Sequence, residues 1–313
     1  MGAEEWIAFA DQHGFALDFK CKKLDLNGRS LRCIPDFTAG LFPFLEILCL
    51  IDTHLTKLPV FKAGALPALK KLLLGYNQLA APLVFDPGVF PVLEVLDLSH
   101  NSMAGPPVFE SKVFPALKKI FLEYNRLTRP PTFKANMFPA LMRLDLTNNS
   151  LVAPLVFELG AFPALESLGL SFNKLTELPA FESGAFPALK DLDLSFNQLT
   201  ELPAFAFDAL LALVHLDLSH NRLTATPIFK EDSKPCMWVK MGGLKRQRIK
   251  YDVNGQAREA DPYCNVWFQY STGQTHTRWT CGHASHCFKP IAPWPPGERN
   301  DSCLVCKCTR RAK

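Results

Sequence analysis

The amino-acid sequence predicts a solenoid of the α/β repeat class, in which a curved parallel β-sheet lines the concave side and a thin layer covers the convex side. Three observations support this prediction: a strict 24-residue period, an alternation of leucines within each period, and a change of composition after residue 233. The predicted domains are a capping helix in residues 1–20, one degenerate and eight full repeats in residues 21–233, and a small basic module rich in cysteine and tryptophan in residues 234–313.

The repeat is defined by a Phe-Pro step, or its equivalent, that recurs every 24 residues. Each period also contains the pattern L-x-x-L-x-L-x-x-N-x-L, as in 189-LKDLDLSFNQL-199. The x-L-x-L part alternates with period two, which predicts a short strand with inward leucines and with the intervening residues on the concave face. The asparagine amide is expected to satisfy backbone groups where the chain leaves the strand. This asparagine stands at Asn77, Asn101, Asn125, Asn149, Asn173, Asn197 and Asn221.

The convex side and the start of the chain carry further signals. Proline-rich connections such as 178-LPAFESGAFPAL-189 suit turns and extended segments better than long helices, so the convex layer should be thin. The segment 3-AEEWIAFADQH-13 predicts a short amphipathic helix that ends at Gly14, with Trp6, Ile7 and Phe9 available to cover the first repeat. An aromatic spine is expected from Phe61, Phe85, Phe109, Phe133, Phe157, Phe181, Phe205 and Phe229.

These motifs resemble the leucine-rich repeat family of the 24-residue kind, over about two thirds of the chain. The resemblance implies that the exposed strand residues bind a protein or peptide on the concave face. Leu73 and Phe121 stand between the last two inward-facing residues of their strands, where neighbouring repeats have a polar residue. Each has lysines and a tyrosine nearby in the sequence. An apolar centre with a polar rim is typical of a protein-binding patch. The alternative is that the aspartates and aromatic residues only build the repeat.

The predicted binding residues become more acidic from the N-terminal to the C-terminal repeats. They are Lys71, Leu73, Tyr76, Asp97, His100, Lys119, Phe121, Tyr124, Arg143, Asp145, Phe172, Asp193, Phe196 and Asp217.

Charge and hydropathy constrain partners and compartment. The formal net charge is +4, but residues 234–313 hold 14 Lys and Arg against five Asp and Glu. The basic run in residues 240–250 is short, so a solvated loop is expected rather than a nucleic-acid contact. The first residues include acidic side chains and no apolar run of signal-peptide length, and no segment approaches the ~20 apolar residues of a membrane helix. We therefore expect a cytoplasmic protein without a transmembrane segment; a secreted protein is the alternative.

Residues 234–313, which we call the tail, are predicted to form a small module held together by a zinc ion or by disulfides. The segment 264-CNVWFQYSTGQTHTRWTC-281 predicts a hairpin that turns at Thr272-Gly273 and places Cys264 opposite Cys281. Opposed residues have Cα atoms ~4.5–5.5 Å apart, which fits either a disulfide or two ligands of one metal ion. The candidate ligands of a structural zinc ion are Cys264, Cys281, His283, Cys287, Cys303 and Cys306.

The spacing Cys281-x-His283-x-x-His286, followed by Cys303-x-x-Cys306, faintly resembles the second half of a RING-type zinc finger. That resemblance implies a ubiquitin-ligase-like adaptor, whose tail recruits a second protein while the concave face selects the substrate. Disulfides in place of zinc would instead fit a secreted pattern-recognition receptor. The sequence contains no paired-carboxylate motif, phosphate loop or nucleophile elbow, so binding without catalysis is the main expectation.

Overall fold

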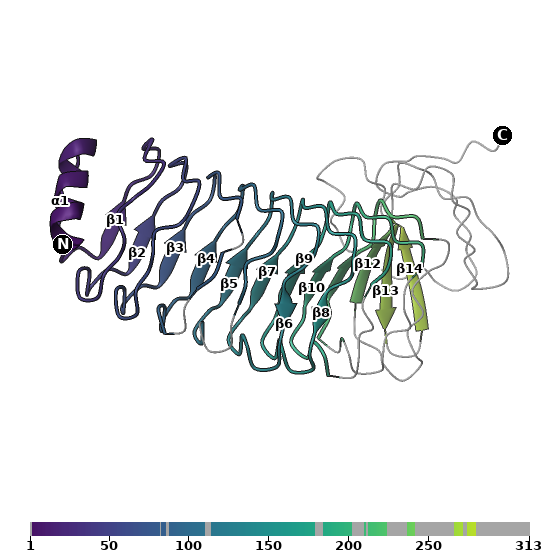
Figure 1. Cartoon of the computed structure of the whole chain (residues 1–313). Coiled ribbons are helices and arrows are strands. Elements are labelled where there is room, and N and C mark those ends of the chain that lie inside the picture. Colours follow the sequence, from purple (N-terminus) through teal and green to yellow (C-terminus); the bar gives the residue numbers. More distant parts are fainter. Residues whose placement is uncertain are drawn as a thin grey trace.

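The computed structural model describes residues 2–81, 83–85, 88–109, 114–178, 184–201, 210 and 212–223, together with the backbone of three further strands. Within these residues, short parallel strands spaced 24 residues apart lie side by side along a solenoid (Figure 1). They are β1 (Lys23–Asp25), β2 (Ile47–Cys49), β3 (Lys71–Leu73), β4 (Val95–Asp97), β5 (Lys119–Phe121), β7 (Arg143–Asp145), β9 (Ser167–Gly169), β10 (Asp191–Asp193) and β11 (His215–Asp217). The predicted parallel-sheet solenoid is confirmed.

The strands pair in register, so each residue lies beside its equivalents one repeat away. Leu48, for example, pairs with Leu24 on one side and with Leu72 on the other. The middle residue of each strand is buried, and full burial of a leucine contributes about 1.5–3 kcal/mol to stability. These middle residues are leucines except for Ile120 in β5, and each is covered by the neighbouring repeats, so the core exists only in the stack.

Two columns of phenylalanine fill the convex side. A spine ring of one repeat packs edge-to-face against the Phe-Pro ring of the next, as Phe85 does against Phe114 at 5.3 Å between centroids. The spine residues that the structure describes are buried or half-buried, which confirms the spine for Phe61, Phe85, Phe109, Phe133 and Phe157. Phe181, Phe205 and Phe229 lie outside the described residues.

The convex layer is thin, as predicted. Its two-residue strands β6 (Thr132–Phe133) and β8 (Val156–Phe157) pair with each other and are separate from the concave sheet. In the part of the chain that the structure describes, no helix occurs within the repeats.

The asparagine ladder ties each turn to the previous repeat. Asn173 donates from Nδ2 to the carbonyls of Leu146 and Leu170, at 3.0 and 3.1 Å, and its Oδ1 accepts from the amide of Leu151 at 3.0 Å. The equivalent asparagines make the same set of contacts. In the first full repeat Thr53 occupies this position, and its hydroxyl donates to the carbonyl of Leu50 at 3.0 Å. The predicted role of the asparagine is confirmed.

Helix α1 (Gly2–His13) caps the first strand of the row (Figure 1). Trp6 is fully buried, its indole N–H donates to the carbonyl of Asp36 at 3.1 Å, and its ring lies 4.9 Å from that of Phe37. The prediction for Ile7 is wrong: its side chain is 49% exposed, because adjacent helical residues point about 100° apart and Trp6 takes the inward direction. Gly14, with φ of 62°, ends the helix as predicted.

Three strands follow the repeats. Strand β12 (Met237–Met241) pairs in parallel with β11, and β13 (Val266–Ser271) and β14 (Gln274–Trp279) continue the sheet in antiparallel fashion. Val266 pairs with Trp279, which is the register that the sequence predicts for this hairpin. The predicted zinc ligands Cys264, Cys281, His283, Cys287, Cys303 and Cys306 lie outside the described residues.

Candidate protein-binding surface

The candidate surface is built by the first and third residue of each strand and by the turn that follows. Because strand residues alternate between the two faces, burial of the middle leucine directs its neighbours to the concave side. The first-position residues Lys71, Lys119 and Arg143 are exposed, whereas the third-position residues are half-buried between neighbouring strands. Those third-position residues are Leu73, Asp97, Phe121, Asp145, Asp193 and Asp217.

The third-position aspartates hold their own turns. One carboxylate oxygen of Asp97 accepts from the amide and the hydroxyl of Ser99, at 2.9 and 2.7 Å, and Asp193 does the same with Ser195. Asp145 accepts from the amide of Thr147 at 3.1 Å. These contacts support a structural role for one oxygen of each carboxylate, so the aspartates cannot be assigned to partner binding alone.

Phe121 is a covered ring, unlike the open apolar centre that the sequence suggests. The Arg143 guanidinium lies 5.4 Å from the centroid of the Phe121 ring and also pairs with Asp145 at 3.0 Å. This cation–π contact joins neighbouring strands, since β5 and β7 are adjacent in the sheet. A partner therefore meets a guanidinium at this point of the surface.

The predicted change from basic to acidic repeats holds for one row only. The exposed first-position row runs from Lys71, Lys119 and Arg143 to Asp191, which contacts His215 Nδ1 at 2.7 Å. The third-position row mixes aspartate with uncharged residues, and it has no such direction: it reads Asp97, Phe121, Asp145, Gly169, Asp193 and Asp217. The surface is therefore mixed in charge across its width as well as along its length.

A row of stacked rings runs along the turns at the carboxyl ends of the strands. Tyr76 and His100 stack at 4.0 Å between centroids, and His100 and Tyr124 stack at 4.2 Å. A second set begins two repeats later, where Phe172 and Phe196 stack at 4.1 Å and Phe196 stacks on His220. The rings of each pair lie within 11° of parallel. The four tyrosine and phenylalanine side chains remain 39–56% exposed, so together they present ring edges and apolar area to solvent.

These rings are held in place by an unusual backbone. The residue before each ladder asparagine has a positive φ, from 50° to 57° for the stacked residues and for Asn148 between them. Non-glycine residues seldom adopt this conformation, and it persists here because the chain on both sides is hydrogen-bonded. The amide of Tyr76 donates to the carbonyl of Ser99, and that of His100 donates to the carbonyl of Glu123. The rings are thus fixed by the repeat before any partner arrives.

A carboxylate that the sequence analysis missed lies among these residues. Glu123 occupies a position that holds glycine, serine or threonine in most repeats, and its Oε2 is buried without a hydrogen-bond partner. Burial raises the pKa of Glu123 to about 7, and the nearby carboxylates of Asp145 and Asp97 add to the shift. The signal was available in the sequence, since one large charged residue stands in a column of small ones.

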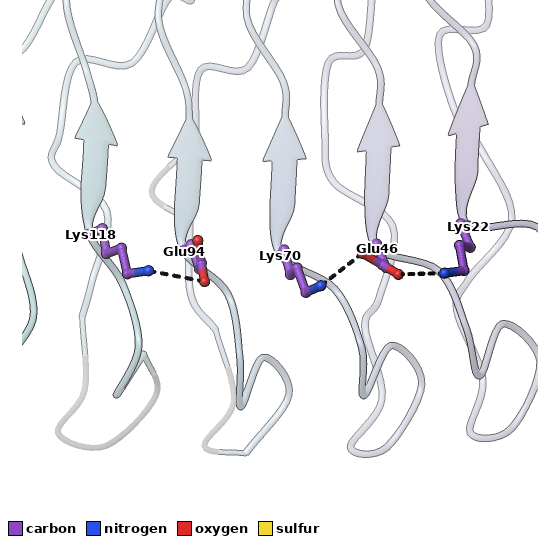
Figure 2. A network of polar contacts seen from close by, with 5 residues as sticks. All are labelled: Lys22, Glu46, Lys70, Glu94 and Lys118. Carbon is purple, nitrogen blue, oxygen red and sulfur yellow. Dashed lines mark hydrogen bonds and ion pairs between the residues drawn. The ribbon is translucent and has the colours of Figure 1, made fainter.

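A ladder of ion pairs marks the opposite edge of the strands. Lys22, Glu46 and Lys70 alternate across the first repeats, with Nζ–O distances of 3.3 and 2.8 Å, and Glu94 pairs with Lys118 at 3.1 Å (Figure 2). The Lys70 ammonium lowers the pKa of Glu46 through a direct hydrogen bond. Solvent screens these exposed pairs, so they contribute mainly to alignment of the repeats.

Comparison with known proteins supports this reading of the repeats. Residues 163–223 match the family model described as leucine rich repeat. This part of the chain is therefore similar in sequence to leucine-rich repeats. The same strand pairing and asparagine contacts continue from the matched residues to the first repeats of the solenoid.

Two solved structures are similar to the chain. InlP from Listeria monocytogenes is 19% identical, with 77% of this chain and 68% of that chain covered and a TM-score of 0.49. YopM from Yersinia enterocolitica is 21% identical, with a TM-score of 0.36, and the match spans 80% of this chain and 60% of YopM. No curated protein matches the chain.

Two further findings concern only the residues that the structure describes. None of their helices is long and apolar enough to cross a membrane. Among the same residues, no group of three or more His, Cys, Asp or Glu side chains is arranged to hold a metal ion.

Proposed function

We propose that this chain is a non-catalytic interaction scaffold that binds a protein or peptide on its concave surface. Leucine-rich repeat proteins in general act as protein-interaction scaffolds. The observation that carries the proposal for this chain is the row of exposed, stacked rings along the strand ends. Rigid aromatic side chains lose little conformational entropy on binding and are enriched among the residues that dominate interface energies.

The mixed charges beside the rings support a protein partner over a nucleic acid. Lys71 and Lys119 are exposed next to the half-buried carboxylates of Asp97 and Asp145. A nucleic-acid surface concentrates positive charge to neutralise phosphates, whereas this surface alternates in sign. Aromatic centres with a charged rim match the composition of protein interfaces.

Site-specific cross-linking in cells that express the full chain tests this proposal. A photoreactive amino acid at Lys119 should give discrete protein adducts, whereas the same residue at Val156, 62% exposed on convex strand β8, should not. Combined replacement of Tyr76 and Phe196 by alanine should lower the Lys119 adduct yield at least tenfold. Equal adducts from both positions, or an unchanged yield in the double variant, would show that the concave surface is not the binding site.

A further inference from the structure

The row of rings is interrupted at one place. Tyr124 and Phe172 are two repeats apart, and the equivalent position between them is Asn148, which has the same backbone conformation but no ring. Tyr124 stacks on His100 and Phe172 stacks on Phe196, in each case on the side away from Asn148. Tyr124 and Phe172 thus flank one position that holds the half-buried Asn148 in place of a ring, which we call the Asn148 gap.

A hollow reaches Asn148 from the side of the N-terminal repeats. This shallow open depression of about 540 Å³ runs along the turns and is lined by Tyr76, His100, Tyr124 and Asn148, among others. Because neighbouring rings stack at 3.9–4.2 Å, the two-step separation leaves room for one planar group of ring thickness above the Asn148 amide. The gap therefore favours a flat occupant.

The charges next to the gap favour a cationic occupant. Glu123 immediately precedes Tyr124 and has a buried oxygen without a partner. Asp145 is the last residue of the strand that leads to Asn148, and its Oδ1 accepts from the amide of Thr147, the residue before Asn148, at 3.1 Å. The same oxygen faces Gly169 of the adjacent strand β9, 2.8 Å from where a Cβ on that glycine would stand. The cation that the structure places here, Arg143, already contacts Asp145 and the ring of Phe121. These half-buried carboxylates would repel a phosphate or carboxylate ligand.

The same repeat also interrupts the ion-pair ladder. At the opposite end of strand β7, Met142 stands between Lys118 and Glu166 of the adjacent repeats and is 39% exposed. The row of rings and the row of ion pairs therefore both lack their recurring side chain in the repeat that contains β7. A segment crossing the sheet there meets an apolar side chain at one edge and the Asn148 gap at the other.

We infer that the Asn148 gap binds the guanidinium of an arginine in an extended segment of the partner protein, stacked between Tyr124 and Phe172. The guanidinium is planar, permanently charged and weakly hydrated, so it can stack on aromatic faces while its N–H groups donate to Glu123 or Asp145. A lysine ammonium carries the charge but cannot stack, and a neutral planar group stacks without the charge. This inference rests on the proposed function and names the side chain that the concave surface selects.

The test is an NMR titration of the full chain with N-acetyl-arginine amide, observed at the ring signals of Tyr124 and Phe172. N-acetyl-citrulline amide is the neutral planar control and N-acetyl-lysine amide is the charged non-planar control. The arginine probe should cause saturable shifts of both rings at concentrations at least fivefold lower than either control. Absence of saturable shifts, or equal responses to all three probes, overturns the inference.

Two variants locate the effect. Asn148→Phe should fill the gap and remove saturable binding, and it should fold because Phe172 and Phe196 occupy the equivalent position with φ of 53°. Glu123→Gln keeps the shape and should weaken arginine binding about fivefold. Retained binding by Asn148→Phe, with an unchanged melting temperature and circular dichroism spectrum, would place the arginine elsewhere and refute the inference. The cross-linking at Lys119 does not depend on this titration. A negative result for arginine binding at the Asn148 gap is therefore distinguishable from a negative result for protein binding at the concave surface.

Discussion

The asparagine ladder permits a stability prediction that can be worked out atom by atom. Replacement of Asn173 by alanine removes a side chain that is 7% exposed. It leaves the amide of Leu151 without the partner that now lies at 3.0 Å, and it removes one of two side-chain hydrogen bonds from each of the carbonyls of Leu146 and Leu170. Asn149 and Asn197 still donate to these carbonyls at 3.1 and 2.9 Å. A buried amide without a partner costs about 1–3 kcal/mol and each lost hydrogen bond about 0.5–1.5 kcal/mol, and water entry at the turn reduces the sum. We expect the free energy of unfolding to fall by about 3 kcal/mol.

The assay is urea unfolding followed by circular dichroism, with a thermal melt beside it. A loss of this size lowers the melting temperature of a domain of 150–250 residues by roughly 6–12 °C. Lys174→Ala is the matched control, because its exposed side chain is the neighbour of Asn173 and its backbone bond to Leu151 is unaffected. Hydrogen exchange supplies a local readout, since the Leu151 amide should lose protection in Asn173→Ala. If Asn173→Ala and Lys174→Ala lowered stability by the same amount, below ~1 kcal/mol, the asparagine contacts would not stabilise the fold appreciably.

Three other predictions follow from the cap, the buried carboxylate and the tail. Trp6→Ala should lower stability by about 3–5 kcal/mol through lost ring packing and the lost indole bond, whereas Ile7→Ala, at a half-exposed site, should change it by less than ~0.5 kcal/mol in the same urea assay. Because burial raises the pKa of Glu123 to about 7, protonation of this carboxyl stabilises the fold. The free energy of unfolding of the native chain, measured relative to that of Glu123→Gln, should be highest below pH ~4.5 and should fall as the pH rises through 7. A difference that does not change with pH would contradict this. For residues 234–313, metal analysis should find about one zinc ion per chain, and a chelator should increase the number of free thiols. If no metal and few free thiols were found, the cysteines would form disulfides and would not bind zinc.

Much of the scaffold was predictable because equivalent positions of the repeat recur many times in equivalent structural environments. A leucine alternation seen once is ambiguous between a strand and a short helix, but the same alternation in register every 24 residues indicates a stacked parallel sheet. The asparagine contacts, the phenylalanine spine at its described positions and the capping helix follow from the same reasoning. Ile7 was misassigned because an apolar residue in a cap is not obliged to face the core when Trp6 fills it.

The candidate surface was predictable in place but not in detail. The exposed strand positions follow from the alternation alone, yet the contact of Arg143 with Phe121 joins two strands and depends on rotamers. The stacking within the aromatic row likewise arises only when the fold brings rings from different repeats to about 4 Å between centroids. Glu123 stands out in the sequence as a large charged residue in a column of small ones, but the burial of its Oε2 without a hydrogen-bond partner is visible only in the structure.

The sequence by itself determined the period, the strand register and the inward residues, because these depend on local alternation and on burial of apolar side chains that no single repeat can achieve. Only the tertiary structure decided which outward side chains satisfy one another and which remain open to a partner. That distinction depends on distances between residues 24 or 48 positions apart. The rings stack, the lysines pair with glutamates, and at Asn148 and Met142 the rows open, because the side chains at those positions lack the ring or the charge that continues them.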